Sequence, residues 1–92
     1  MTREEILDKA KECITGKRVT DYGKPEDNFM HIAHLWNSYL ADNLVDPISS
    51  RDVAVMMALM KIARIASGTA TEDSFVDACG YMACGGELPG NG

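Results

Sequence analysis

Residues 49–67 read SSRDVAVMMALMKIARIAS, and between Val53 and Ala66 only Lys61 and Arg64 are not apolar. At about 100° per residue, the apolar side chains of such a helix cover well over half of its circumference, and the two cations fall on one narrow strip. A helix that is apolar nearly all round is a buried one. We therefore expect a central, buried helix whose only polar strip is cationic.

Three other segments also have apolar residues at helical intervals, and each begins with a helix-start signal. Thr2 and Glu5 have the capping-box spacing, Pro25 suits a first helical turn, and Thr69 with Glu72 repeats the capping-box spacing. The predicted helices span residues 3–15, 25–41, 49–67 and 71–84. The fold expected is an all-α, compact four-helix bundle, with one domain over residues 1–84 and a flexible C-terminal tail over residues 85–92.

Composition restricts the class of protein. The chain has 92 residues and a formal net charge of −5, which argues against duplex nucleic acid as a partner, because affinity for phosphate backbones comes from clustered Lys and Arg. No segment has the character of a signal peptide or a membrane span, so we expect a cytoplasmic protein with no membrane partner. A monomer of this size buries only about 60% of its unfolded surface, and the many Met, Ile and Leu residues therefore favour a homo-oligomer.

Potential metal ligands lack the spacing of a metal site. Asp27, His31 and His34 lie along one side of the second predicted helix, but they do not form the HExxH pattern. The three cysteines, at positions 13, 79 and 84, are odd in number and have no CxxC spacing. We predict neither a metal site nor a disulfide framework.

Residues 16–25, GKRVTDYGKP, contain two glycines and a proline without periodicity, which predicts a connecting loop. Ten residues exceed the usual length of a link between helices, and a long loop is a common place for binding residues. This loop has two interpretations. It lines a site with Lys17, Arg18, Tyr22 and Lys24, or it is a solvated connector in which Tyr22 only covers the edge of the core.

A second polar strip lies on the last predicted helix, where Asp73, Asp77 and Tyr81 are four residues apart and share one face. A connector of about three residues joins this helix to the central one, so the two should form an antiparallel hairpin. Counting outward from the turn places Lys61 level with Asp77 and Arg64 close to Asp73. Two cations are therefore expected to face two carboxylates.

These facing charges also have two interpretations. They are either salt bridges that hold the hairpin in register, or part of a binding site beside it. In the second case Lys61 and Arg64 bind phosphate, while the ring of Tyr22, Trp36 or Tyr81 stacks on a base.

Four segments carry a resemblance to a known family: DYGKPEDNF, IAHLWNSYL, SRDVAVMMALMKIARIASG and EDSFVDACGY. They resemble a family of small phage and prophage domains of unknown function with YG-P-E-NF, DVA-MM-L-KIAR and DS-VD-AGY motifs. That family is distantly similar to the MazG-like all-α nucleoside triphosphate pyrophosphatases. The resemblance implies a helical bundle, often dimeric, in which ExxE and ExxD pairs on successive helices bind magnesium for cleavage between the α and β phosphates.

The magnesium ligands of those enzymes transfer poorly to this chain. Asp77 falls at the final Asp of ExxD, but Ser74 stands in the place of its Glu, and Lys61 and Arg64 have the ExxE spacing with the opposite charge. Cations at those positions would repel the metal ion. The resemblance therefore supports the fold and a nucleotide-like ligand better than it supports hydrolysis.

The leading hypothesis is a phage-type protein in the host cytoplasm that binds or sequesters a small anionic ligand, a nucleotide or nucleotide-derived signal, without catalysis or cofactor. This role would suit management of nucleotide pools or interference with a host signal. One alternative is a magnesium-dependent nucleotide pyrophosphatase that uses Asp73 and Asp77 with either Glu72 or acids of the second predicted helix. The other is a structural or protein-interaction module. The candidate ligand-binding residues are Lys61, Arg64, Asp77, Asp73, Tyr81, Tyr22, Lys24, Asn28 and Trp36.

Overall fold

The computed structural model describes residues 1–69 and 71–89, and the regular elements within them are all helical. The described residues form four long helices, one short helix and one 3-10 turn. They are α1 (Arg3–Ile14), α2 (Lys17–Tyr22), α3 (Pro25–Leu40), the turn η1 (Ala41–Asn43), α4 (Ser50–Ala66) and α5 (Glu72–Glu87). The all-α class predicted from the sequence is confirmed.

Side-chain caps begin α1 and α4. Thr2 Oγ1 accepts a hydrogen bond from the N–H of Glu5 at 3.1 Å, and the equivalent bond from Asp52 to Ser49 Oγ is 3.0 Å long. The start of α5 differs from the prediction, because Thr69 Oγ1 lies 3.0 Å from Ser67 Oγ at the end of α4. The residue that precedes α5 is Thr71, so the predicted pairing of Thr69 with Glu72 is wrong.

The segment between α1 and α3 is not wholly a loop, because its middle forms α2. Gly16 precedes this helix with a φ of 61° and Gly23 follows it with a φ of 83°. Both values lie in the left-handed region, which glycine adopts without a steric cost. The two glycines thus let the chain turn sharply on either side of a single short helix. The sequence did not reveal this helix, because six residues are too few to show a helical period.

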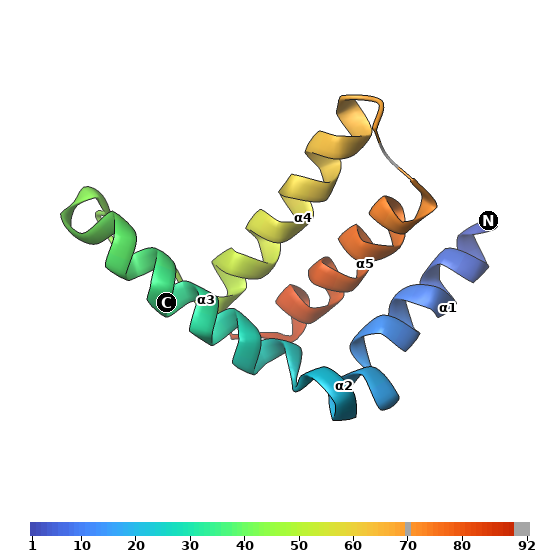
Figure 1. Cartoon of the computed structure of the whole chain (residues 1–92), viewed down its shortest axis with the longest axis horizontal. Coiled ribbons are helices and arrows are strands. Elements are labelled where there is room, and N and C mark those ends of the chain that lie inside the picture. Colours follow the sequence, from blue (N-terminus) through green and yellow to red (C-terminus); the bar gives the residue numbers. More distant parts are fainter. Residues whose placement is uncertain (70, 90–92) are drawn as a thin grey trace.

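Helix α5 lies between α4 and α1 (Figure 1). It runs beside α4 in the opposite direction and also packs against α1, while α3 crosses near the start of α4 and α2 links α1 to α3. The core cluster joins α3 to α4 through Phe29, Ala33, Val53 and Ala54. Val53 and Val76, from α4 and α5, are the largest fully buried side chains of the described residues.

The predicted burial of α4 on all sides is wrong for the single chain. Val53, Ala54 and Ala58 are buried on one side, but the opposite side is open, and Leu59 and Ile62 are 55% and 49% exposed. The chain is also less compact than predicted. Its radius of gyration is 14.1 Å, against about 12 Å for a globular domain of this length. The open side of α4 arises because α5 and α3, the elements that pack most against it, leave the opposite side uncovered.

The last helix is longer than predicted. It continues past residue 84 to Glu87, and Gly85 is buried against α4, where an added Cβ would lie 3.0 Å from the Cβ of Ala54. The glycine pair that indicated a tail instead permits close helix packing. Ala70 of the predicted connector and residues 90–92 of the predicted tail lie outside the described residues.

Candidate functional site

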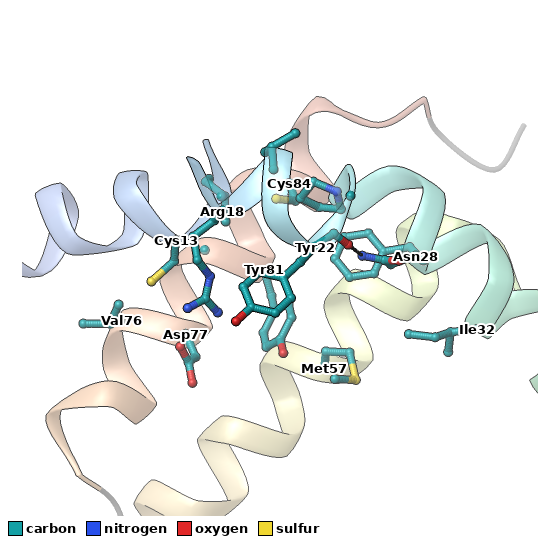
Figure 2. A pocket seen from close by; sticks show the side chains of 16 residues that line it. Cys13, Arg18, Tyr22, Asn28, Ile32, Met57, Val76, Asp77, Tyr81 and Cys84 are labelled. Atoms are coloured by element: carbon teal, nitrogen blue, oxygen red, sulfur yellow. Dashed lines mark hydrogen bonds between the residues drawn. The ribbon is translucent and has the colours of Figure 1, made fainter. Parts of the chain in front are cut away.

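A cavity of about 270 Å³ lies where α1, α2, α3 and α5 meet, with Met57 of α4 at its base (Figure 2). Its lining combines aromatic, polar and apolar side chains and two thiols. The aromatic and polar members are Arg18, Tyr22, Asn28, Phe29, Asp77 and Tyr81. This mixture of an apolar wall and a few convergent polar groups is typical of small-molecule sites.

The short helix α2 forms one wall of the cavity. Arg18 and Tyr22 are four residues apart and therefore share one face of it, and the Arg18 guanidinium carbon lies 4.9 Å from the centre of the Tyr22 ring. Asn28 of α3 donates from Nδ2 to the carbonyl oxygen of Tyr22 at 3.4 Å, which links the end of α2 to α3. Figure 2 shows Arg18 and Tyr22 extending from this wall towards Tyr81 and Asp77.

The opposite wall belongs to α5. The Tyr81 ring lies 6.2 Å from the Phe29 ring, centre to centre, at an angle of 54°, which is a favourable tilted arrangement of two aromatic rings. At the preceding residue, an added Cβ on Gly80 would lie 3.2 Å from Cγ2 of Ile14 in α1. Gly80 therefore allows α1 to approach α5 at the edge of the cavity. Glycine is unfavourable inside a helix, and this close approach explains its presence at position 80.

The polar edge of the cavity contains an ion pair between α4 and α5. Lys61 Nζ lies 3.1 Å from Asp77 Oδ2, and the two side chains are 15% and 35% exposed. Asp77 lines the cavity, whereas Lys61 reaches it only through this pair. The pairing of Lys61 with Asp77 expected from the hairpin register is thus present.

The second expected pair is absent. Arg64 and Asp73 are both exposed, and the described residues show no ion pair between them. An exposed ion pair gains at most about 1 kcal/mol, which is too little to offset the entropy lost when two long side chains are fixed.

The thiol of Cys84 also faces this cavity. Burial is the main cause that raises the pKa of Cys84 above its usual value, and the negative charges of Glu26 and Glu87 add to the effect. The neutral thiol is therefore the stable form around neutral pH. Cys13 lines the same cavity, whereas Cys79 does not.

Comparison with known proteins places the chain in a family. The model of a domain of unknown function (DUF6378) matches residues 5–89. The chain belongs to this family. The Gene 55 protein of Mycobacterium phage D29 is 44% identical over 81 residues, which cover 88% of this chain and 51% of that protein. The Gene 55 protein of Mycobacterium phage L5 is 43% identical over 76 residues, which cover 83% of this chain and 47% of that protein.

The DUF6378 domain thus spans about half the length of the curated relatives it matches. No solved structure matches it. The resemblance to a family of small phage domains of unknown function agrees with these relatives, while the more distant similarity to MazG-like enzymes stays a prediction. Among the described residues, no helix is long and apolar enough to cross a membrane.

The structure of the DUF6378 domain separates the predicted binding residues into two groups. Tyr22, Asn28, Asp77 and Tyr81 line one cavity, and Lys61 adjoins it through Asp77. The others lie outside the lining: Trp36 packs against the core, and Lys24, Arg64 and Asp73 are exposed.

Arg18 is the residue that the predicted binding set lacks. The sequence named it among the possible lining residues of the loop, but nothing there distinguished it from Lys17. The distinguishing signal is its four-residue spacing from Tyr22, which has meaning only once residues 17–22 are known to be helical.

The donor set also bears on metal binding. In the described part of the chain, no three His, Cys, Asp or Glu residues come together in a way that would hold a metal ion. The cavity contributes one carboxylate, Asp77, and Lys61 already pairs with it. Magnesium takes several oxygen ligands, so this arrangement suits an organic ligand better than a protein-bound Mg²⁺.

Proposed function

We propose that the DUF6378 domain binds a small anionic ligand with an aromatic ring, a nucleotide or nucleotide-derived signal, in the cavity between α2 and α5, and that it does so without catalysis. The observation that carries this proposal is the convergence of Arg18 with the rings of Tyr22 and Tyr81 at one cavity. Rings offer stacking surfaces to a base, and a guanidinium offers a bidentate donor to a phosphate.

The electrostatics of the site support an anion. Among the residues that line the cavity Arg18 is the one cation, and Asp77 is the one carboxylate. Since Lys61 neutralises Asp77 at 3.1 Å, the charge of Arg18 is left to attract a ligand. The phosphate-binding role that the sequence assigned to Lys61 and Arg64 is thus better filled by Arg18, with Lys61 acting through Asp77.

The cavity volume indicates which part of the ligand enters. About 270 Å³ lies just below the common range of ligand pockets, about 300 to 1,000 Å³. A heterocyclic base therefore occupies the space between the walls, and the phosphates remain near Arg18 at the opening. This placement makes α2 the part of the domain that recognises the anionic group.

The architecture supports a MazG-like outline as part of the same proposal. The opposite directions of α4 and α5 and the Lys61–Asp77 ion pair between them support a core hairpin. The pyrophosphatase alternative needs further carboxylates beside Asp77. Release of pyrophosphate from nucleoside triphosphates that requires magnesium and disappears in Asp77→Asn would favour that alternative over binding alone.

The test of binding uses the cysteines as internal reporters. Nucleotides, cyclic ones included, are screened by calorimetry, and the rate of alkylation is then followed for each thiol by mass spectrometry. A ligand in the cavity slows the alkylation of Cys13 and Cys84, which line it, and leaves that of Cys79 unchanged. Equal protection of all three thiols, or no heat of binding at millimolar nucleotide, would contradict the proposal.

Two variants of α2 test the role of Arg18. Arg18→Gln removes a charge-assisted hydrogen bond and should weaken nucleotide binding by about 10-fold or more. Lys17→Gln makes the same change of charge on the same helix, but position 17 does not line the cavity, and its affinity should stay within about 2-fold of the unaltered chain. Equal losses in both variants would show that only net charge matters.

A further inference from the structure

The side of α4 that faces away from α5 carries an uninterrupted apolar surface. It consists of side chains three or four residues apart, which we name the α4 apolar face: Val55, Met56, Leu59, Ile62, Ala63 and Ala66. All six are exposed in the single chain, and no charged residue interrupts them. Scattered apolar residues are common on protein surfaces, but a contiguous apolar surface marks a site of interaction.

The accessible surface area of the whole chain also indicates a surface that a partner covers. The chain exposes 6625 Å², whereas a folded monomer of its mass, 10.0 kDa, exposes about 5,200 Å². The excess of about 1,400 Å² is larger than the roughly 800 Å² that each partner buries in an interface of standard size. The single chain therefore has more than enough uncovered surface for one stable contact.

The sizes of the side chains on this face favour a second, antiparallel copy of α4 as the partner. The bulky residues of the face run from Val55 to Ile62, and the small ones, Ala63 and Ala66, lie at its end. If a second α4 packs in the opposite direction about Leu59, Val55 of each copy meets Ala63 of the other, and Met56 meets Ile62. A parallel arrangement would place alanine against alanine and leave a void. Opposite directions also bring unlike helix-dipole ends together.

We infer that a second copy of this chain covers the α4 apolar face and forms a two-fold symmetric dimer, with the two α4 helices antiparallel and the Leu59 side chains meeting at the axis. Such a contact is isologous, since the same surface serves both copies. The dimer covers α4 on the side that α5 leaves open, so the helix becomes buried nearly all round. The cavity lies on the other side of α4, so the inference does not depend on the proposed ligand.

The first measurement is the mass of the full chain in solution at micromolar concentration, by light scattering or sedimentation equilibrium. We expect twice the 10.0 kDa of one chain. A monomer mass throughout the concentration range would overturn the inference, and the face would then have another occupant, such as the additional residues of the longer relatives.

Variants of one exposed leucine locate the interface. Leu59→Lys places two like charges at the axis, and the mass should fall to that of a monomer while circular dichroism still shows a folded helix. Leu7→Lys is the matched control, because Leu7 of α1 is about as exposed as Leu59 but lies outside the α4 apolar face. This variant should remain dimeric. Loss of the dimer in Leu7→Lys, or a dimer that survives Leu59→Lys, would contradict the inferred interface.

A mixing experiment tests the symmetry. Leu59→Lys and Leu59→Glu should each be monomeric alone, and an equimolar mixture should recover a mixed dimer, because opposite charges then meet at the axis. Leu59→Cys should likewise give a disulfide-linked dimer on mild oxidation, whereas Leu7→Cys should not. Failure of both results would exclude a two-fold axis at Leu59.

Discussion

Two cations of α4, Lys61 and Arg64, have different surroundings. The ammonium of Lys61 is engaged by Asp77 between two helices, while the guanidinium of Arg64, one turn further along α4, is solvated. The sequence could predict the first pair from the register of the helices. It could not predict the absence of the second, because exposure at a helix end depends on how the turn between the helices is built.

Removal of the Lys61 side chain should therefore destabilise the fold. Lys61→Ala leaves Asp77 partly buried without its counter-charge, and we expect the free energy of unfolding to fall by about 1–2 kcal/mol, less than for a fully buried pair because Asp77 is in part solvated. Arg64→Ala should change it by less than about 0.5 kcal/mol. Urea unfolding followed by circular dichroism measures both, and equal losses would contradict the assignment.

The thiol of Cys84 provides a prediction about pH. Because burial and the nearby charges of Glu26 and Glu87 raise its pKa, the thiolate forms at a higher pH than in an exposed cysteine. Alkylation of Cys84 by iodoacetamide should therefore reach half its maximal rate at a higher pH than alkylation of a short cysteine peptide. Glu26→Gln removes one charge and should move the midpoint part of the way back, and an unchanged midpoint would contradict a role for that charge.

The same pKa shift determines the sign of the effect on stability. Since the folded-state pKa of Cys84 lies above that of the unfolded chain, its contribution to stability is complete below the unfolded-state pKa. That contribution is lost as the pH rises through the folded-state pKa. Cys84→Ser should accordingly make unfolding less dependent on pH in the alkaline range.

At the scale of whole elements, the four long helices could be predicted because each has a helical period and a start signal. Two features could not. The period of α2 is hidden by its length of six residues, and the end of α5 is disguised by Gly85 and Gly86, which read as a break although α4 needs the first of them for close packing. The sequence pattern of one helix does not show how closely a neighbouring helix packs against it.

The two adjacent glycines of α5 should respond oppositely to substitution. Gly85→Ala places a Cβ 3.0 Å from that of Ala54, a contact that neither helix can relieve by a side-chain rotation, so the melting temperature should fall. Gly86→Ala meets nothing within 4 Å and should gain up to about 1 kcal/mol from helix propensity. Thermal denaturation compares the pair, and a stabilised Gly85→Ala would show that α4 and α5 separate easily.

For the molecule as a whole, the apolar pattern of α4 predicts burial on nearly all sides, whereas the single chain covers this helix on one side only. A second chain that covers the other side stays a prediction of the inferred dimer. The same limit applies to the candidate site. The sequence proposed Tyr22, Asn28, Asp77 and Tyr81 as binding residues, and all four line the cavity, while the position of Arg18 depends on the helix α2 that the sequence did not reveal. The spacing of two residues in the sequence predicts whether they are neighbours on one helix. Which residues of different helices meet depends on how the helices cross.

Dimerisation should also make thermal stability depend on concentration. Association linked to folding raises the melting temperature as protein concentration rises, by mass action. The unaltered chain should show this dependence, and Leu59→Lys should melt at one temperature whatever its concentration. A melting temperature that is constant in both proteins would contradict a dimer that contributes to stability.

The short helix α2 buries none of its residues, and it turns away from α1 and α3 at glycines. If the cavity binds a ligand as proposed, substitutions along the exposed length of α2 should change which ligand binds while leaving the core, and with it the unfolding midpoint, almost unaltered. The α2 part of the proposed site would then be separate from the residues that hold the fold together. A lineage that must follow a changing ligand can thus explore new preferences within six positions, without the loss of stability that usually accompanies mutations in a binding site.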